Sequence, residues 1–136
     1  MRIAASLAVA LLFSVAAAQA QQLEGQWVAR SAANGVVIDT VVVITGQTYI
    51  SNQTMYSGGA TYFTSQSGEV FFNPPDNLRL VVLDWSPKDY LGQPQAMPPN
   101  TNWTIYELTD TQLGVAEPAC LRTAPMNQCY VRFRRQ

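Results

Sequence analysis

The residues of this chain that could do chemistry are few, and histidine is absent. Histidine is the usual general base near neutral pH and a common zinc and copper ligand, so its absence argues against Ser-His or Cys-His catalysis and most such metal sites. The single lysine, Lys88, stands between Pro87 and Asp89 and is better explained as a solvated charge than as a Schiff-base nucleophile. No glycine-rich phosphate loop or dinucleotide-binding motif occurs.

Acidic residues are the remaining catalytic candidates, because two carboxylates alone can support glycoside hydrolysis. Most of the candidates fall at expected strand ends or turns. The candidates are Asp39, Glu69, Asp76, Asp84, Glu107, Asp110 and Glu117. Asp84 lies near the end of the most apolar expected strand, residues 78–85, but aspartate favours turns, and a turn carboxylate is the better interpretation. The sequence therefore predicts a non-enzymatic protein with no catalytic residues, no metal site and no cofactor.

Aromatic residues offer a different kind of site. Trp85, Tyr90, Trp103 and Tyr106 lie in or near the one long irregular segment, residues 86–101, which carries four prolines. Irregular segments of this length are uncommon in small domains and are often functional. We take these four aromatic residues as a candidate ligand-binding set, with the alternative that such side chains fill a hydrophobic core.

The first twenty residues have the pattern of an export signal. Arg2 supplies a positive start, residues 3–18 are apolar apart from two serines, and Ala18-Gln19-Ala20 is the small-x-small pattern that signal peptidase accepts. We expect residues 1–20 to be removed, leaving a domain of residues 21–136 in the periplasm or outside the cell. No cysteine stands at its start to carry a lipid anchor, and no later apolar run is long enough to span a membrane.

The charge balance of residues 21–136 limits the kinds of partner to expect, and their two cysteines predict a disulfide. Without Arg2 there are seven basic and nine acidic residues, a balance that predicts neither nucleic-acid binding nor a polybasic membrane contact. The only two cysteines, Cys120 and Cys129, would reach an oxidising compartment and are expected to form a disulfide. The alternative is a redox-active or metal-binding pair, but the spacing of the two cysteines matches no common motif of either kind.

Residues 21–136 are expected to form short antiparallel strands. Polar and apolar residues alternate, β-branched and aromatic residues are frequent, and turn formers recur roughly every ten residues. The expected strands cover residues 26–30, 36–45, 49–50, 69–72, 78–85, 103–108, 112–117 and 129–135, with others around Tyr56 and 61–63 and a helical turn near 87–90. About eight strands in one small domain predict an all-β fold, a barrel or a sandwich.

The segment Leu23-Glu24-Gly25-Gln26-Trp27 places a Gly-x-Trp sequence on the first expected strand. This motif resembles the lipocalins and the wider calycin group of small up-and-down barrels, and the exported chain is similar to compact bacterial members. The resemblance implies that Gly25 turns the chain beneath the barrel, that Trp27 plugs its end, and that an arginine of the last strand stacks over the indole. Arg132 and Arg134 share one face of that strand, and either is expected to supply this cation.

We therefore expect an exported binding module that engages a small apolar ligand or a protein partner through the barrel mouth and the 86–101 loop. Two alternatives stay open: a structural or assembly component of the cell envelope or an extracellular layer, and a calycin-type protease inhibitor. Residues 41–44 and 78–83 are almost wholly apolar on both faces, whereas a barrel strand needs only one apolar face. We expect the loop to cover the second face or, failing that, a second copy in a homo-oligomer.

Overall fold

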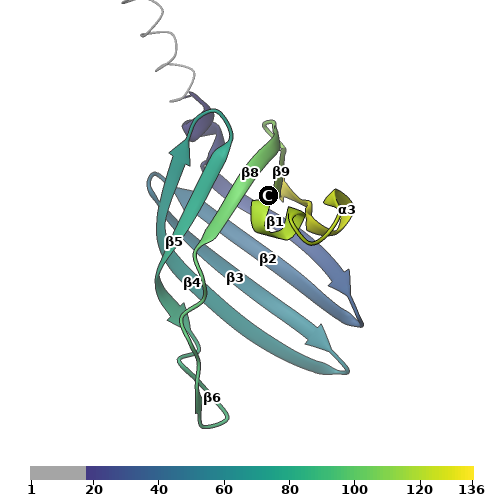
Figure 1. The fold of residues 1–136 in the computed structure, drawn as a ribbon. Helices are drawn as coiled ribbons and strands as arrows, with labels where there is room; N and C mark the ends of the chain where they lie inside the picture. Colours follow the sequence, from purple (N-terminus) through teal and green to yellow (C-terminus); the bar gives the residue numbers. More distant parts are fainter. Residues whose placement is uncertain (1–17) are drawn as a thin grey trace, which may run out of the picture.

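The computed structural model describes residues 18–136, so the predicted export signal lies outside the described residues except for residues 18–20. Eight antiparallel strands close into a barrel in the order β1-β10-β9-β8-β5-β4-β3-β2 (Figure 1), which confirms the expected all-β barrel. The barrel strands are β1 Gly25–Ala33, β2 Val36–Thr45, β3 Thr48–Ser57, β4 Ala60–Asn73, β5 Asn77–Ser86, β8 Thr101–Leu108, β9 Gln112–Ala116 and β10 Val131–Arg135. Among the described residues, no helix is long and apolar enough to cross a membrane.

Strands β1 to β4 form three consecutive hairpins, and each of them is longer than β8, β9 or β10 (Figure 1). The β1–β2 turn is Asn34-Gly35, whose φ angles of 53° and 77° are those a two-residue type I′ turn requires. Register between β1 and β2 runs without interruption from Gly25 opposite Ile44 to Ala33 opposite Val36. These hairpins extend beyond the part of the barrel that β8, β9 and β10 close, so one end of the molecule is open.

Strand β4 is a single strand of 14 residues, where the sequence predicted two short ones around 61–63 and 69–72. Its pairing with β3 runs without interruption from Ala60 to Glu69, whereas its ladder to β5 shifts register between Ser67 and Gly68, where β5 carries the extra residue Leu83. Gly68 lies very close to β5 at this point, since a Cβ there would overlap the carbonyl oxygen of Val81. Strand β3 likewise joins the predicted segments around Tyr49 and Tyr56.

The closed end of the barrel holds the hydrophobic core. Trp27 is fully buried, and its indole N–H donates to the carbonyl oxygen of Leu23 at 2.8 Å. Leu23 itself is buried and belongs to a helical stretch over residues 18–23, within which the predicted cleavage point after Ala20 falls. The buried residues packed together here are Leu23, Trp27, Val42, Ile44, Tyr49, Val70, Leu78, Leu80, Leu113, Val115 and Phe133.

The cation that covers Trp27 is Arg135, so the expectation that Arg132 or Arg134 would do so is wrong. The Arg135 guanidinium carbon lies 4.3 Å from the centre of the indole ring, and the group also donates to the carbonyl oxygens of Gln22, Glu24 and Asp110. Arg132 instead pairs with Glu107 at 3.2 Å, and Arg134 is exposed.

The alternation of inward and outward side chains along β10 explains why Arg135 is the residue that covers Trp27. Phe133 is buried inside the barrel, and Arg135, two residues later, shares its inward face, whereas Arg132 and Arg134 face outward. Gly25 also serves the contact with Arg135. Its φ is +128°, and a Cβ there would overlap the guanidinium of Arg135. Gly25 and Trp27 therefore both lie at the closed end of the barrel.

Short elements outside the barrel were not all expected. A two-stranded hairpin, β6 Asp89–Tyr90 and β7 Gln93–Pro94, replaces the helical turn predicted near 87–90. Helices α2 Pro118–Leu121 and α3 Met126–Cys129 interrupt the path from β9 to β10. The disulfide between Cys120 and Cys129, which the sequence predicted, joins these two helices.

The 86–101 loop follows the edge of β5 and does not cover the outer face of that strand. The Val82 N–H donates to the side-chain oxygen of Asn100 at 2.9 Å, along the edge that β8 leaves free beyond Leu80. On the outer face, Leu83 stays 61% exposed. The expectation that the loop would cover the second apolar face of residues 78–83 is therefore wrong at Leu83.

Candidate functional site

The open half of the barrel contains a cavity of about 330 Å³, adjoined by a second of about 200 Å³. Ser51, Gln53, Gln66 and Pro98 line both, so we treat them as one site and call it the cup. The cup's further lining residues include Ala29, Ser31, Ile38, Thr40, Val42, Tyr62, Thr64, Leu80, Trp85, Gln95, Trp103, Glu117, Val131 and Phe133. A volume of this size suits a small molecule.

The floor of the cup is apolar. Trp103 of β8 and Phe133 of β10 pack with their ring centres 5.6 Å apart, and Val42 and Leu80 complete the surface beside them. Val42, Leu80 and Phe133 belong to the buried core, which makes this floor a rigid part of the structure. An apolar group that entered the cup would meet a surface that is already formed.

Above the floor runs a belt of uncharged hydrogen-bonding side chains. Strand alternation points Ser51 and Gln53 of β3 inward, where they lie opposite Gln66 and Thr64 of β4. Thr40 of β2 and Ser31 of β1 continue the belt around the cavity. Hydroxyl and amide groups of this kind both donate and accept, so the belt can bind neutral polar groups without a charge.

Ser51 is the only buried polar residue among residues 18–136, with 8% of its surface exposed. Within that range its hydroxyl has no side-chain partner, yet no fully enclosed side-chain oxygen or nitrogen lacks a hydrogen bond. The hydroxyl therefore faces the open volume of the cup. Beside it, Gln66 donates to the Tyr49 hydroxyl at 3.2 Å, and burial raises the pKa of that phenol, which keeps it neutral.

One wall of the cup is built by the 86–101 loop. The indole N–H of Trp85 donates to the carbonyl oxygen of Gln95 at 3.3 Å, which holds the loop against the end of β5. Lys88 lies 3.8 Å above the centre of the Trp85 ring and contacts Asp84 at 2.5 Å. The hydrogen bond from Lys88 lowers the pKa of the Asp84 carboxyl below its ordinary value.

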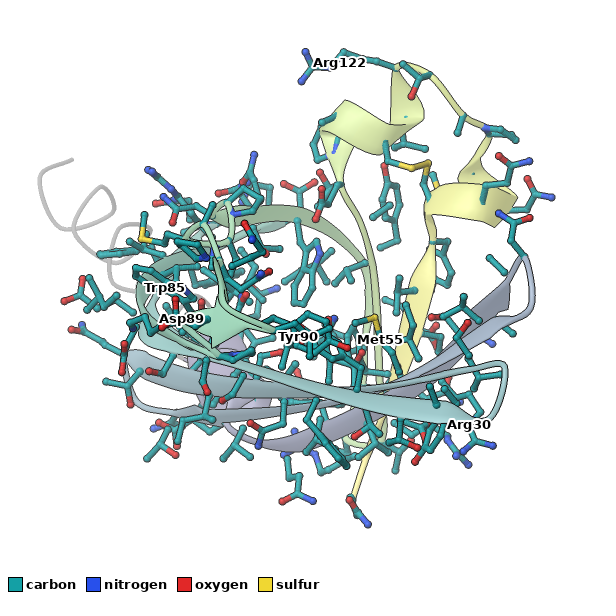
Figure 2. All side chains as sticks on the ribbon, turned by 90° about the horizontal axis from the view of Figure 1, so that it is seen from below. Arg30, Met55, Trp85, Asp89, Tyr90 and Arg122 are labelled. Atoms are coloured by element: carbon teal, nitrogen blue, oxygen red, sulfur yellow. A yellow bond between two sulfur atoms is a disulfide. The ribbon has the colours of Figure 1, made fainter. Side chains whose placement is uncertain are left out.

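The rim carries further aromatic contacts. Tyr90, on the β6–β7 hairpin, packs edge to face on Tyr62 of β4, with ring centres 4.7 Å apart. Figure 2 looks toward this end of the barrel and places Trp85 and Asp89 on one side of the molecule and Arg30 on the opposite side. The rim is therefore asymmetric, with the loop on one side and the ends of the long hairpins on the other.

The four aromatic residues proposed from the sequence do not form one set. Trp85 and Trp103 line the cup, the first in its wall and the second in its floor. Tyr90 lies at the rim, where it packs on Tyr62 and is 45% exposed. Tyr106 is on the outer surface beside Tyr130 and has no part in the cup.

Sequence reasoning missed the polar belt entirely. Ser51, Gln53, Thr64 and Gln66 lie in a stretch of serine, threonine and glutamine whose two faces are similarly polar, so alternation could not show which face was interior. The signal that existed was Tyr49, an aromatic residue two positions before Ser51 and therefore on the same face. Because Tyr49 is buried, the residues of β3 that alternate with it, Ser51 and Gln53, also point into the barrel.

The site is nearly free of charge. Among its lining residues only Glu117 carries a formal charge, and it is exposed at the edge. In the part of the chain that the structure describes, no group of three or more His, Cys, Asp or Glu residues could hold a metal ion. Comparison of the chain with protein-family models, with curated proteins and with solved structures finds no match.

Proposed function

We propose that this protein is an exported, non-enzymatic binding module that holds a small neutral molecule in the cup. The observation that carries the proposal is the layering of the cavity, an apolar floor of Trp103 and Phe133 beneath the uncharged belt around Ser51. A ligand with an apolar part and neutral hydrogen-bonding groups would match both layers. The sequence led us to expect a small apolar ligand. The polar belt adds the requirement that this ligand also forms hydrogen bonds.

Energetics supports a partly polar ligand over a purely apolar one. A hydrocarbon filling the cup would displace water from Ser51, Gln53 and Gln66 without replacing its hydrogen bonds. Each buried polar group left unpaired in this way costs about 1–3 kcal/mol. A ligand that hydrogen-bonds to the belt avoids this cost while still covering the aromatic floor.

The closed barrel, the Gly-x-Trp strand and the arginine over the indole also support a lipocalin-like binding role. The proposal that the protein is exported, and that it belongs to the bacterial calycins, rests on the sequence pattern of residues 1–20 and on this resemblance. The disulfide between Cys120 and Cys129 is compatible with an oxidising compartment.

Native mass spectrometry of the protein, recovered from its own source under non-denaturing conditions, tests the proposal. We expect a small molecule to be retained by the wild-type protein. The variant Ser51→Leu, which fills the cup, should lose at least about nine-tenths of that occupancy. The matched control is Asn52→Leu on the exposed outer face of the same strand, which should retain it.

Circular dichroism establishes that both variants keep the barrel. A wild-type protein recovered without any small molecule would contradict the proposal. So would a Ser51→Leu variant that retains the molecule as fully as Asn52→Leu does.

A further inference from the structure

Three arginines lie together on the outer face of the barrel, where β1 meets β10. Val28 pairs with Arg134, so the same register continued by two residues sets Arg30 beside Arg132. All three arginine side chains face away from the interior, in alternation with buried neighbours on their strands. Like charges placed opposite each other destabilise a sheet, so an anion bound between them would be stabilising.

The three arginines line an open hollow of about 650 Å³, which we call the arginine hollow. Its other lining residues are Val28, Ala29, Asp39, Thr40, Val41 and Gln136. Three basic side chains and one acidic side chain leave a surplus of two positive charges here. Residues 21–136 as a whole carry more acidic than basic groups, so the arginine hollow is a local positive site on an acidic protein.

Two carboxylates hold arginines of the hollow from opposite sides. Asp39 of β2 accepts from Nε and Nη2 of Arg30 at 2.6 and 2.8 Å. Glu107 of β8 lies beyond β9, and its Oε2 is 3.2 Å from Nη2 of Arg132. Arg132 reaches across Gly114 of β9, which pairs with both Arg132 and Glu107 and has no side chain to block the contact. Glu107 does not line the hollow, so among the lining side chains only Asp39 would repel an anion.

Donor groups remain available for a ligand. A guanidinium has five N–H groups, and the contacts of Arg30 with Asp39 leave its Nη1 without a partner among residues 18–136. Over the same residues, Arg134 forms no ion pair. The planar fork of a guanidinium matches two oxygen atoms of a phosphate or sulfate group, which makes arginine well suited to bind such groups.

We propose that the arginine hollow binds a phosphate or sulfate ester, with Arg134 as its main ligand and Arg30 and Arg132 beside it. A phosphate ester carries close to two negative charges at neutral pH, which matches the charge surplus of the hollow. The hollow is larger than a single oxyanion, and the organic part of an ester would rest on Val28 and Val41, which pair with each other on the same outer face. The site lies outside the barrel, so the proposal does not rest on the ligand of the cup.

Nuclear magnetic resonance of the isotope-labelled protein, titrated with inorganic phosphate, tests the site. Ionic strength is held constant with sodium chloride, because salt screens exposed charges. We expect saturable shifts of the main-chain amides of residues 28–30 and 132–134. Arg134→Gln should weaken phosphate binding at least about tenfold, since it removes a charged donor. The matched control is Arg79→Gln, which removes an exposed arginine of β5 and should change the affinity less than about twofold.

Two results would overturn the proposal. The first is a wild-type protein whose amide shifts are the same in phosphate as in chloride. The second is an Arg134→Gln variant that binds phosphate as tightly as Arg79→Gln, with circular dichroism showing an intact barrel in both.

Two further probes identify the source of the anionic group. Glycerol 3-phosphate represents a soluble ester, and vesicles of phosphatidylcholine with phosphatidic acid present the same group on a lipid. Saturable binding of glycerol 3-phosphate without sedimentation on the vesicles supports a soluble ligand. Sedimentation that is lost in Arg134→Gln and with vesicles of phosphatidylcholine alone supports a lipid head group. Failure of both probes would overturn the assignment of an ester.

Discussion

At the scale of single residues, Arg135 joins distant parts of the chain at the closed end. Its guanidinium covers Trp27 and donates to three carbonyl oxygens, of Gln22, Glu24 and Asp110. These carbonyl groups belong to the segment before β1 and to the turn between β8 and β9. A planar group with several fixed donors is suited to such a position, whereas an ammonium is not.

We expect Arg135→Ala to lower the free energy of unfolding by about 2–4 kcal/mol, because it removes both the cation–π contact and hydrogen bonds from a charged donor. Arg135→Lys should recover only a small part of this loss. Urea denaturation followed by tryptophan fluorescence measures the change. Arg134→Ala, one residue away on the outer face, is the control and should change stability by less than about 0.5 kcal/mol. Equal losses from the two variants would refute the assignment.

The same residue shows how far the sequence could lead. Gly25 and Trp27 could be identified from their spacing, but the choice of arginine required knowing which face of β10 is interior. Val131 and Phe133 define that face, and Arg135 continues it. The polar belt of the cup was harder to predict, because neither face of β3 near Ser51 is distinctly apolar and only the folded register shows which one points inward.

At the scale of elements, β4 depends on Gly68. The strand predicted as two pieces is one strand, paired with β3 without interruption, and its pairing with β5 shifts register beside this glycine. The sequence suggested a break there, since glycine is a common turn former, whereas the structure uses the missing Cβ for close approach to Val81. Composition alone does not distinguish these two uses of glycine.

We expect Gly68→Ala to destabilise the protein by about 2–4 kcal/mol, since the added methyl group meets main-chain atoms of β5 that cannot move without breaking the ladder. Thermal unfolding followed by circular dichroism measures this. Ser67→Ala, the preceding residue in the same strand, should cost less than about 1 kcal/mol. If Gly68→Ala melted at the wild-type temperature, close packing of β4 on β5 at this point would be disproved.

At the scale of the whole molecule, stability is distributed unevenly along the barrel. The buried core lies at the closed end, around Trp27, Leu78 and Val115, whereas the long hairpins reach the open end with polar or exposed residues near their turns. Local opening is easiest where few apolar contacts must be broken.

The rate of amide hydrogen exchange should therefore depend on the distance of an amide from the closed end of the barrel, and not on the strand to which it belongs. We expect main-chain amides near Trp27, Ile44 and Leu113 to exchange slowest, at rates set by global unfolding. Amides near the Asn34-Gly35 and Gly58-Gly59 turns should exchange at least about a hundredfold faster, although they lie on the same strands or hairpins. Exchange followed by mass spectrometry at native pH measures both groups. Uniform protection along β1 to β4 would contradict this distribution.

Barrel closure also has a consequence for how the chain reaches its native state during synthesis. Strand β10 completes the ring against β1, and Arg135 contacts Glu24 across a separation of 111 residues. Hairpins β1 to β4 contain only local pairings and can form as soon as they emerge. The indole of Trp27 has no cation over it until residue 135 has been made. A chain made only as far as β9 therefore cannot close the barrel, and its core at this end lacks both β10 and the covering guanidinium.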